Sequence, residues 1–133
     1  MPEKKEMTNA QALLEFQQGE LDAVILYRKI AAQIKNAEVA SVLRKIARDE
    51  GRHAAILFKL TRETLKPKET QANMVSLLMR VIGAKTLFPI IAKKEYAAFD
   101  KYAPFISEHP ELAEIQQDER KHGNKISGLV KLL

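Results

Sequence analysis

Two glutamate–histidine pairs are the residues of this chain best suited to chemistry. His53 follows Glu50 by three positions, and His122 follows Glu119 by the same spacing. Residues three apart lie on one face of an α-helix, so each pair can direct a carboxylate and an imidazole at one point. Two of the three histidines in the chain have such a partner, which glutamates placed at random would rarely produce. The pairs therefore predict a metal site.

Two single glutamates complete the predicted site. Glu20 and Glu95 lie in the middle of apolar stripes with helical spacing, where a purely structural bundle would have leucine. A buried carboxylate is costly without a compensating ion. Four carboxylates and two imidazoles neutralise two divalent ions, and this ligand set suits iron, with manganese as the alternative. The predicted metal ligands are Glu20, Glu50, His53, Glu95, Glu119 and His122.

Two tyrosines occupy matching positions after the single glutamates. Tyr27 follows Glu20 by seven residues, and Tyr102 follows Glu95 by seven. Seven residues are about two helical turns, so each tyrosine shares a helix face with its glutamate. Two interpretations stay open: a phenol that hydrogen-bonds a metal-bound carboxylate, and an amphipathic aromatic residue at the edge of the core. In the first interpretation Tyr27 and Tyr102 are candidate catalytic residues.

Helical segments must position these residues, because the chain has only five glycines and five prolines and no segment requires a strand. The expected helices cover Thr8–Lys35 with a Thr8–Gln11 capping pattern, Val39–Leu60 extended to a stop at Pro67, Phe88–Tyr102, and Leu112–Leu133 with Pro110 in its first turn. We predict an all-α four-helix bundle in which residues 1–133 form one domain.

The connection between the second and third long helices leaves the topology open. The segment Glu69–Ile82 is apolar and compatible with a helix, and Gly83 follows it. A short crossover helix here would let the second and third long helices run parallel. A single continuous third helix would instead suit an up-and-down bundle or a dimer that exchanges helix pairs.

Composition excludes several other classes of protein. Without cysteine, the chain has no disulfide, thiolate zinc site or iron–sulfur centre of its own. No apolar run approaches the roughly 20 residues of a membrane span, and Met1–Glu6 lacks the apolar core of a signal peptide. The net charge of +5 comes from basic residues scattered among acidic ones, which argues against a nucleic-acid interface. We expect a cytoplasmic protein.

The pattern resembles a known family. Its order of Glu, Glu-x-x-His, Glu and Glu-x-x-His over residues 20–122 is similar to that of the ferritin-like di-iron proteins. The segments LYRKIA, IARDEGRHAAIL and HPELAEIQQDERKH resemble the erythrin domain of rubrerythrins. The resemblance implies a ferritin-like bundle whose di-iron centre reduces hydrogen peroxide or reacts with dioxygen. It also implies that Glu50 and Glu119 bridge the metals, with Glu20 and Glu95 as terminal ligands.

The sequence departs from that family in two ways. Typical rubrerythrins carry a cysteine-rich rubredoxin domain that supplies electrons, whereas this chain has no cysteine, so we expect a separate electron-donor protein. Rubrerythrins usually have a further glutamate one turn from the first on the third helix, but here Ala92 and Ala98 flank Glu95. The six-residue set is closer to that of bacterioferritins.

These observations rank three functions. The leading hypothesis is a rubrerythrin-like redox enzyme that reduces hydrogen peroxide or reacts with dioxygen. The alternatives are a ferritin-like protein of iron oxidation, storage or delivery, and a helical interaction bundle without catalysis. Because helical bundles of this kind commonly form symmetric oligomers, we expect a homodimer.

Overall fold

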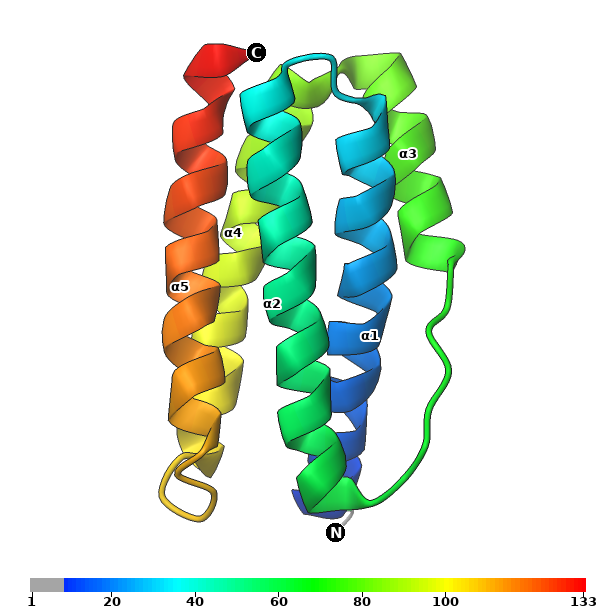
Figure 1. Ribbon diagram of the computed structural model, residues 1–133. Coiled ribbons are helices and arrows are strands. Elements are labelled where there is room, and N and C mark those ends of the chain that lie inside the picture. Colours follow the sequence, from blue (N-terminus) through cyan, green and yellow to red (C-terminus); the bar gives the residue numbers. More distant parts are fainter. Residues whose placement is uncertain (1–8) are drawn as a thin grey trace, which may run out of the picture.

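The computed structural model describes residues 9–133, and every regular element in this range is helical. Four long helices form the bundle: α1 (Asn9–Gln33), α2 (Ala37–Thr61), α4 (Ala84–Tyr102) and α5 (Leu112–Leu129). A shorter helix, α3 (Thr70–Ile82), packs against α1 on the outside of the bundle (Figure 1). Single 3-10 turns, Ala103–Phe105 and Val130–Leu132, follow α4 and α5. The predicted all-α four-helix bundle is confirmed.

The crossover helix is separate from the third long helix. Figure 1 shows that residues 62–69 and α3 carry the chain back along the bundle, so that α2 and α4 run in the same direction. Gly83 lies between α3 and α4 with φ 85°, a backbone conformation that glycine adopts without a steric penalty. Its N–H donates to the Met79 carbonyl and ends α3. The alternative of one continuous third helix is not formed.

Helix α2 ends six residues before Pro67, where the sequence analysis placed its stop. Its last residue is Thr61, and Arg62 takes a left-handed conformation in which its N–H donates to the Phe58 carbonyl. Side chains of α1 then hold the extended segment that follows: Gln17 donates to the Glu63 carbonyl and Gln18 to the Lys66 carbonyl. These tertiary hydrogen bonds replace the helical ones, and sequence periodicity does not report them.

The other helix ends differ little from the prediction. The expected start at Thr8, its capping pattern and the segment Met1–Glu6 lie outside the described residues. Helix α5 begins at Leu112, after a turn that contains Pro110, and gives way to the last 3-10 turn after Leu129. Helix α2 has a polar start, because the Asn36 side chain accepts a hydrogen bond from the Val39 N–H.

The core consists of two apolar clusters on either side of a polar layer. The larger cluster includes Ile30, Leu43, Phe88 and Ile126, and the smaller one includes Leu13, Leu57, Leu112 and Ile115. The predicted metal ligands lie between these clusters along the sequence of each helix, so apolar side chains enclose them from both ends of the bundle. None of the helices between residues 9 and 133 combines the length and apolar character needed to cross a lipid bilayer.

Candidate metal centre

All six predicted ligands meet inside the bundle. Helix α1 contributes Glu20, α4 contributes Glu95, and each of α2 and α5 contributes one glutamate and one histidine. Every one of these side chains is buried, with at most 7% of its residue surface exposed. Helical spacing explains this convergence, since each residue is in phase with the apolar stripe of its own helix. Their role as ligands stays a prediction.

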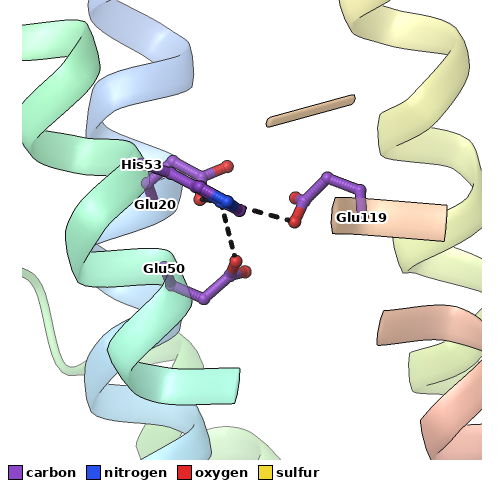
Figure 2. Close-up of side chains that lie close together, drawn as sticks. All are labelled: Glu20, Glu50, His53 and Glu119. Atoms are coloured by element: carbon purple, nitrogen blue, oxygen red, sulfur yellow. Dashed lines mark hydrogen bonds and ion pairs between the residues drawn. The ribbon is translucent and has the colours of Figure 1, made fainter. Parts of the chain in front are cut away.

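The first group of candidate ligands is Glu20, Glu50, His53 and Glu119. The Nδ1 atom of His53 lies 2.9 Å from Glu20 Oε1, 3.1 Å from Glu50 Oε1 and 3.6 Å from Glu119 Oε1. Figure 2 shows Glu119 reaching from α5 toward the three side chains of α1 and α2. Three carboxylates and one imidazole nitrogen thus surround a single point.

The second group is Glu50, Glu95, Glu119 and His122. Here the Nδ1 atom of His122 lies 3.2 Å from Glu95 Oε1, 3.2 Å from Glu119 Oε1 and 3.4 Å from Glu50 Oε1. In each group, the candidate ligand atoms lie within 4.8 Å of one another. Glu50 and Glu119 belong to both groups, which is the arrangement needed for two carboxylates to bridge two ions.

Two buried oxygens test whether the cluster fits metal ions. In the described part of the chain, Glu50 Oε1 and Glu119 Oε1 have no hydrogen-bond donor, although their residues are only 1% and 2% exposed. An unpaired buried carboxylate oxygen is strongly unfavourable. Both atoms face the imidazole Nδ1 atoms of the two groups, so an ion in each group would satisfy them. The residues present therefore fit a pair of metal ions.

The two candidate tyrosines contact Glu20 and Glu95 in a crossed arrangement. The Tyr102 hydroxyl on α4 donates to Glu20 Oε2 on α1 at 3.0 Å. Burial is the main cause that raises the pKa of Tyr27 well above its ordinary value, and the charge of Glu95 and a hydrogen bond to Glu95 act in the same direction. Burial and the charge of Glu20 raise the pKa of Tyr102 in the same direction. Both phenols therefore keep their protons, and each tyrosine lies beside the glutamate of the opposite helix.

Asp49 and Asp118 belong to the site although the sequence analysis did not select them. The Nε2 atom of His53 lies 2.8 Å from Asp118 Oδ2, and that of His122 lies 2.8 Å from Asp49 Oδ2. Each aspartate thus orients the histidine of the other helix, leaving Nδ1 to face the carboxylates. The available signal was the repeat itself, because both pairs read Asp-Glu-x-x-His.

Arg52 connects the two aspartates at the surface of the site. Its guanidinium lies 2.7 Å from Asp118 and 3.5 Å from Asp49, and it also contacts Glu114. Burial opposes ionisation of Asp118, but hydrogen bonds from His53 and Arg52 outweigh it and lower the pKa of this carboxyl. Asp118 therefore stays an anion that accepts a hydrogen bond from the His53 Nε2–H.

Without metal, several histidines and glutamates of the cluster are protonated. Burial alone would lower the pKa of His53, but hydrogen bonds to Glu20 and Asp118 raise it to about 9. Burial alone would also lower the pKa of His122, but the nearby carboxylates of Glu119 and Glu95 raise it to about 11. Burial and the charge of Glu20 raise the pKa of Glu119 to about 8, and burial likewise raises that of Glu50. Metal ions would have to displace these protons.

Comparison with known proteins identifies the family. The rubrerythrin family model matches residues 13–130, a range that contains all six clustered glutamates and histidines. A search of curated proteins and a search of solved structures gave no match. The family match and the buried carboxylate–imidazole cluster together fit a di-iron protein. Because the match covers nearly the whole chain, the protein belongs to the rubrerythrin family.

Proposed function

We propose that this protein is a di-iron redox enzyme that reduces hydrogen peroxide, with manganese as the alternative metal. The observation that carries the proposal is the pair of ligand groups that share Glu50 and Glu119. Two ions held by common carboxylates can deliver two electrons to one substrate molecule. Hydrogen peroxide takes up two electrons and two protons and gives two molecules of water.

The residues of the chain would bind and orient the reacting groups. Tyr102 and Tyr27 hold the carboxylates of Glu20 and Glu95 in place, and Asp118 fixes the imidazole of His53. The apolar clusters exclude water from the two ends of the bundle on either side of the carboxylates. Two ferrous ions bound here would supply the electrons, and a separate electron-donor protein would restore them, since the chain has no cysteine for a redox centre of its own.

Iron oxidation with storage or delivery is the second candidate function. Ala92 and Ala98 occupy the positions three before and three after Glu95, so α4 offers the cluster one carboxylate only, as the bacterioferritin-like set does. The size of the oligomer separates the two candidates. A large cage in light scattering would favour storage, whereas a dimer would favour the enzyme.

We further propose that the protein forms a homodimer through the outer face of α3. Met74, Leu77 and Val81 are 60%, 59% and 71% exposed, and their spacing places them on one side of this helix. Contiguous apolar surface of this kind marks protein interfaces. Val81→Lys should convert a dimer into a monomer in sedimentation experiments, and a wild-type monomer would contradict the proposal.

A rapid-mixing experiment tests the enzymatic function. The anaerobic diferrous protein is mixed with hydrogen peroxide or with air-saturated buffer while near-ultraviolet absorbance is recorded. Oxidation that is faster with peroxide is the expected result. Faster oxidation with air would overturn the peroxidase assignment in favour of iron oxidation.

A further inference from the structure

A long groove opens between α1 and α4 directly over the metal centre. Its floor is formed by candidate ligands and by both tyrosines: Glu20, Tyr27, Glu50, Glu95, Tyr102 and Glu119. Helices α1 and α2 pack along one another, as do α4 and α5, whereas α1 and α4 make little contact. The α1–α4 face is therefore the open side of the bundle and gives access to the centre.

The groove is much larger than peroxide or dioxygen requires. Its volume is about 620 Å³, whereas one water molecule takes up about 30 Å³ of liquid. Pockets of several hundred cubic ångströms are typical of sites for organic ligands. The size of this groove is thus matched to an organic molecule that lies above the metal centre.

Small side chains on both walls keep the groove open. Gly19 and Ala23 on α1 and Ala98 on α4 line the groove, and a methyl group added at Gly19 would meet no atom within 4 Å. Near its floor, the groove reaches the two buried oxygens of Glu50 and Glu119 that have no hydrogen-bond donor in the described residues. Metal ions would satisfy those oxygens and leave the space above them for a further ligand.

The upper part of the groove has an apolar lining on three helices. Leu26 of α1, Val75 and Leu78 of α3, and Leu87 and Ile91 of α4 line it. From Lys94 to Leu87 the helix rises by about 10 Å, at 1.5 Å per residue. That length suits the alkyl chain of a medium-chain molecule.

Beyond the apolar part of the groove, two lysine side chains could bind a negatively charged group of such a ligand. Lys94 and Lys101 of α4 both line the groove, and within residues 9–133 neither ammonium has a carboxylate within 4.0 Å. Asp22 of α1 is engaged by Gln18 and by the Lys68 N–H. Glu15 lies in the groove beside the lower end with Lys101, so Lys94 is the better partner for an anion.

We propose that the α1–α4 groove binds a medium-chain carboxylate, with its carboxylate at Lys94 and its alkyl chain in the apolar part under α3. The ligand would cover the metal centre and limit the access of water to it. This inference depends on the shape and charge of the groove, and it does not require that the centre reduce peroxide.

Isothermal titration with decanoate tests the proposal on the full chain, with and without bound metal. We expect saturable binding of one decanoate per chain, and weaker binding of decanol, which lacks the charge. Ala23→Phe fills the groove and should weaken binding about tenfold or more, whereas Ala97→Phe, on an exposed part of α4 outside the groove, should not. Lys94→Gln should weaken it about fivefold, and Lys93→Gln should leave it unchanged.

Three results would overturn the proposal: no saturable binding, equal binding by Ala23→Phe and the wild type, or equal affinity for decanol and decanoate. A dimer that Ala23→Phe dissociates, without decanoate binding, would show that a second copy covers the groove instead. Metal counted in the same samples separates this proposal from the proposed function. Two metals without decanoate binding would reject only the groove ligand, whereas decanoate binding without metal would reject only the redox centre.

Discussion

Glu119 belongs to both groups of candidate metal ligands. Its Oε1 atom lies near Nδ1 of both histidines and has no hydrogen-bond donor in the described structure. Glu119→Gln removes the negative charge from both positions at once, so we expect the variant to lose the paired-metal signal and to bind at most one metal per chain. Glu111→Gln, at the exposed start of α5, is the matched control. Retention of two metals by Glu119→Gln would contradict the bridging assignment.

Asp118 positions His53 and does not belong to either ligand group. Loss of a hydrogen-bond partner of this kind typically weakens metal affinity by about 10- to 100-fold. We expect Asp118→Asn to show a decrease in this range by competition with a chelator, with two metals still bound at saturation. Asp100→Asn, on the exposed side of α4, provides the control. An unchanged affinity would mean that Asp118 has no positioning role.

The protonation of the metal-free cluster predicts that two properties change in opposite directions as the pH rises. The stability of the metal-free protein should fall, and the affinity for metal should rise. His53 has its pKa raised from 6.5 to about 9, and Glu119 has its pKa raised from 4.5 to about 8. A group whose pKa is higher in the folded protein than in the unfolded chain stabilises the fold. This stabilisation is complete below the unfolded-state pKa and is lost as the pH rises through the folded-state pKa. We therefore expect the stability of the metal-free protein to fall as the pH rises, from 4.5 to about 8 through Glu119 and from 6.5 to about 9 through His53.

Metal uptake should follow the reverse trend, because the ions displace protons from these groups. Apparent metal affinity should rise with pH, and binding at neutral pH should release about two protons or more. Urea unfolding of the metal-free protein and calorimetric titration with manganese in buffers of different ionisation enthalpy measure the two effects. Proton uptake on metal binding would be inconsistent with the assigned protonation states.

At the scale of elements, the packing of α4 against α5 depends on Gly123. A methyl group added there would lie 2.6 Å from the Tyr96 ring, and Tyr96 is held by a hydrogen bond to Asn124. Gly123→Ala must move the ring or the helix, beside His122. We expect it to lower the stability by about 1–3 kcal/mol and to weaken metal binding.

Gly128 provides the matched control on the same helix. A methyl group added at Gly128 meets no atom within 4 Å, so Gly128→Ala should stabilise the protein by up to about 1 kcal/mol through helix propensity. Chemical denaturation of the two variants checks the contrast. Equal effects would show that the close approach of α5 to Tyr96 does not limit the packing.

The sequence could predict the inner faces of the helices but not every helix end or the groove. Helical spacing was sufficient to place the six candidate ligands on four inner faces, because burial follows the apolar stripe of each helix. It was not sufficient for the end of α2, where Gln17 and Gln18 bind the following backbone. Nor could it predict the groove, since residues such as Ala23 and Ala98 line it from helices far apart in the sequence.

On the scale of the whole molecule, the candidate metal centre lies between two helical hairpins. Helices α1 and α2 pack extensively, as do α4 and α5, while contacts between the two pairs are sparser. Each ligand group takes residues from both pairs, so each ion would link them. At metal concentrations of 100 times Kd, one bound ion adds about 2.7 kcal/mol to the stability.

We therefore expect a chelator to lower the melting temperature and to increase hydrogen exchange in all four long helices. The increase should be largest in α1 and α4, whose open face has the least packing to replace the ions. Glu119→Gln provides the comparison, because a variant that binds at most one metal should show a smaller decrease in melting temperature than the wild type. A wild-type melting temperature that the chelator does not change would argue for the interaction-bundle alternative.

The most direct test of the central claim is anaerobic titration of the metal-free protein with ferrous iron, with the bound metal counted per chain. Because four carboxylates and two imidazoles form two groups that share Glu50 and Glu119, we predict saturation at two irons per chain. Absence of binding, or saturation at one, would contradict the two-metal centre.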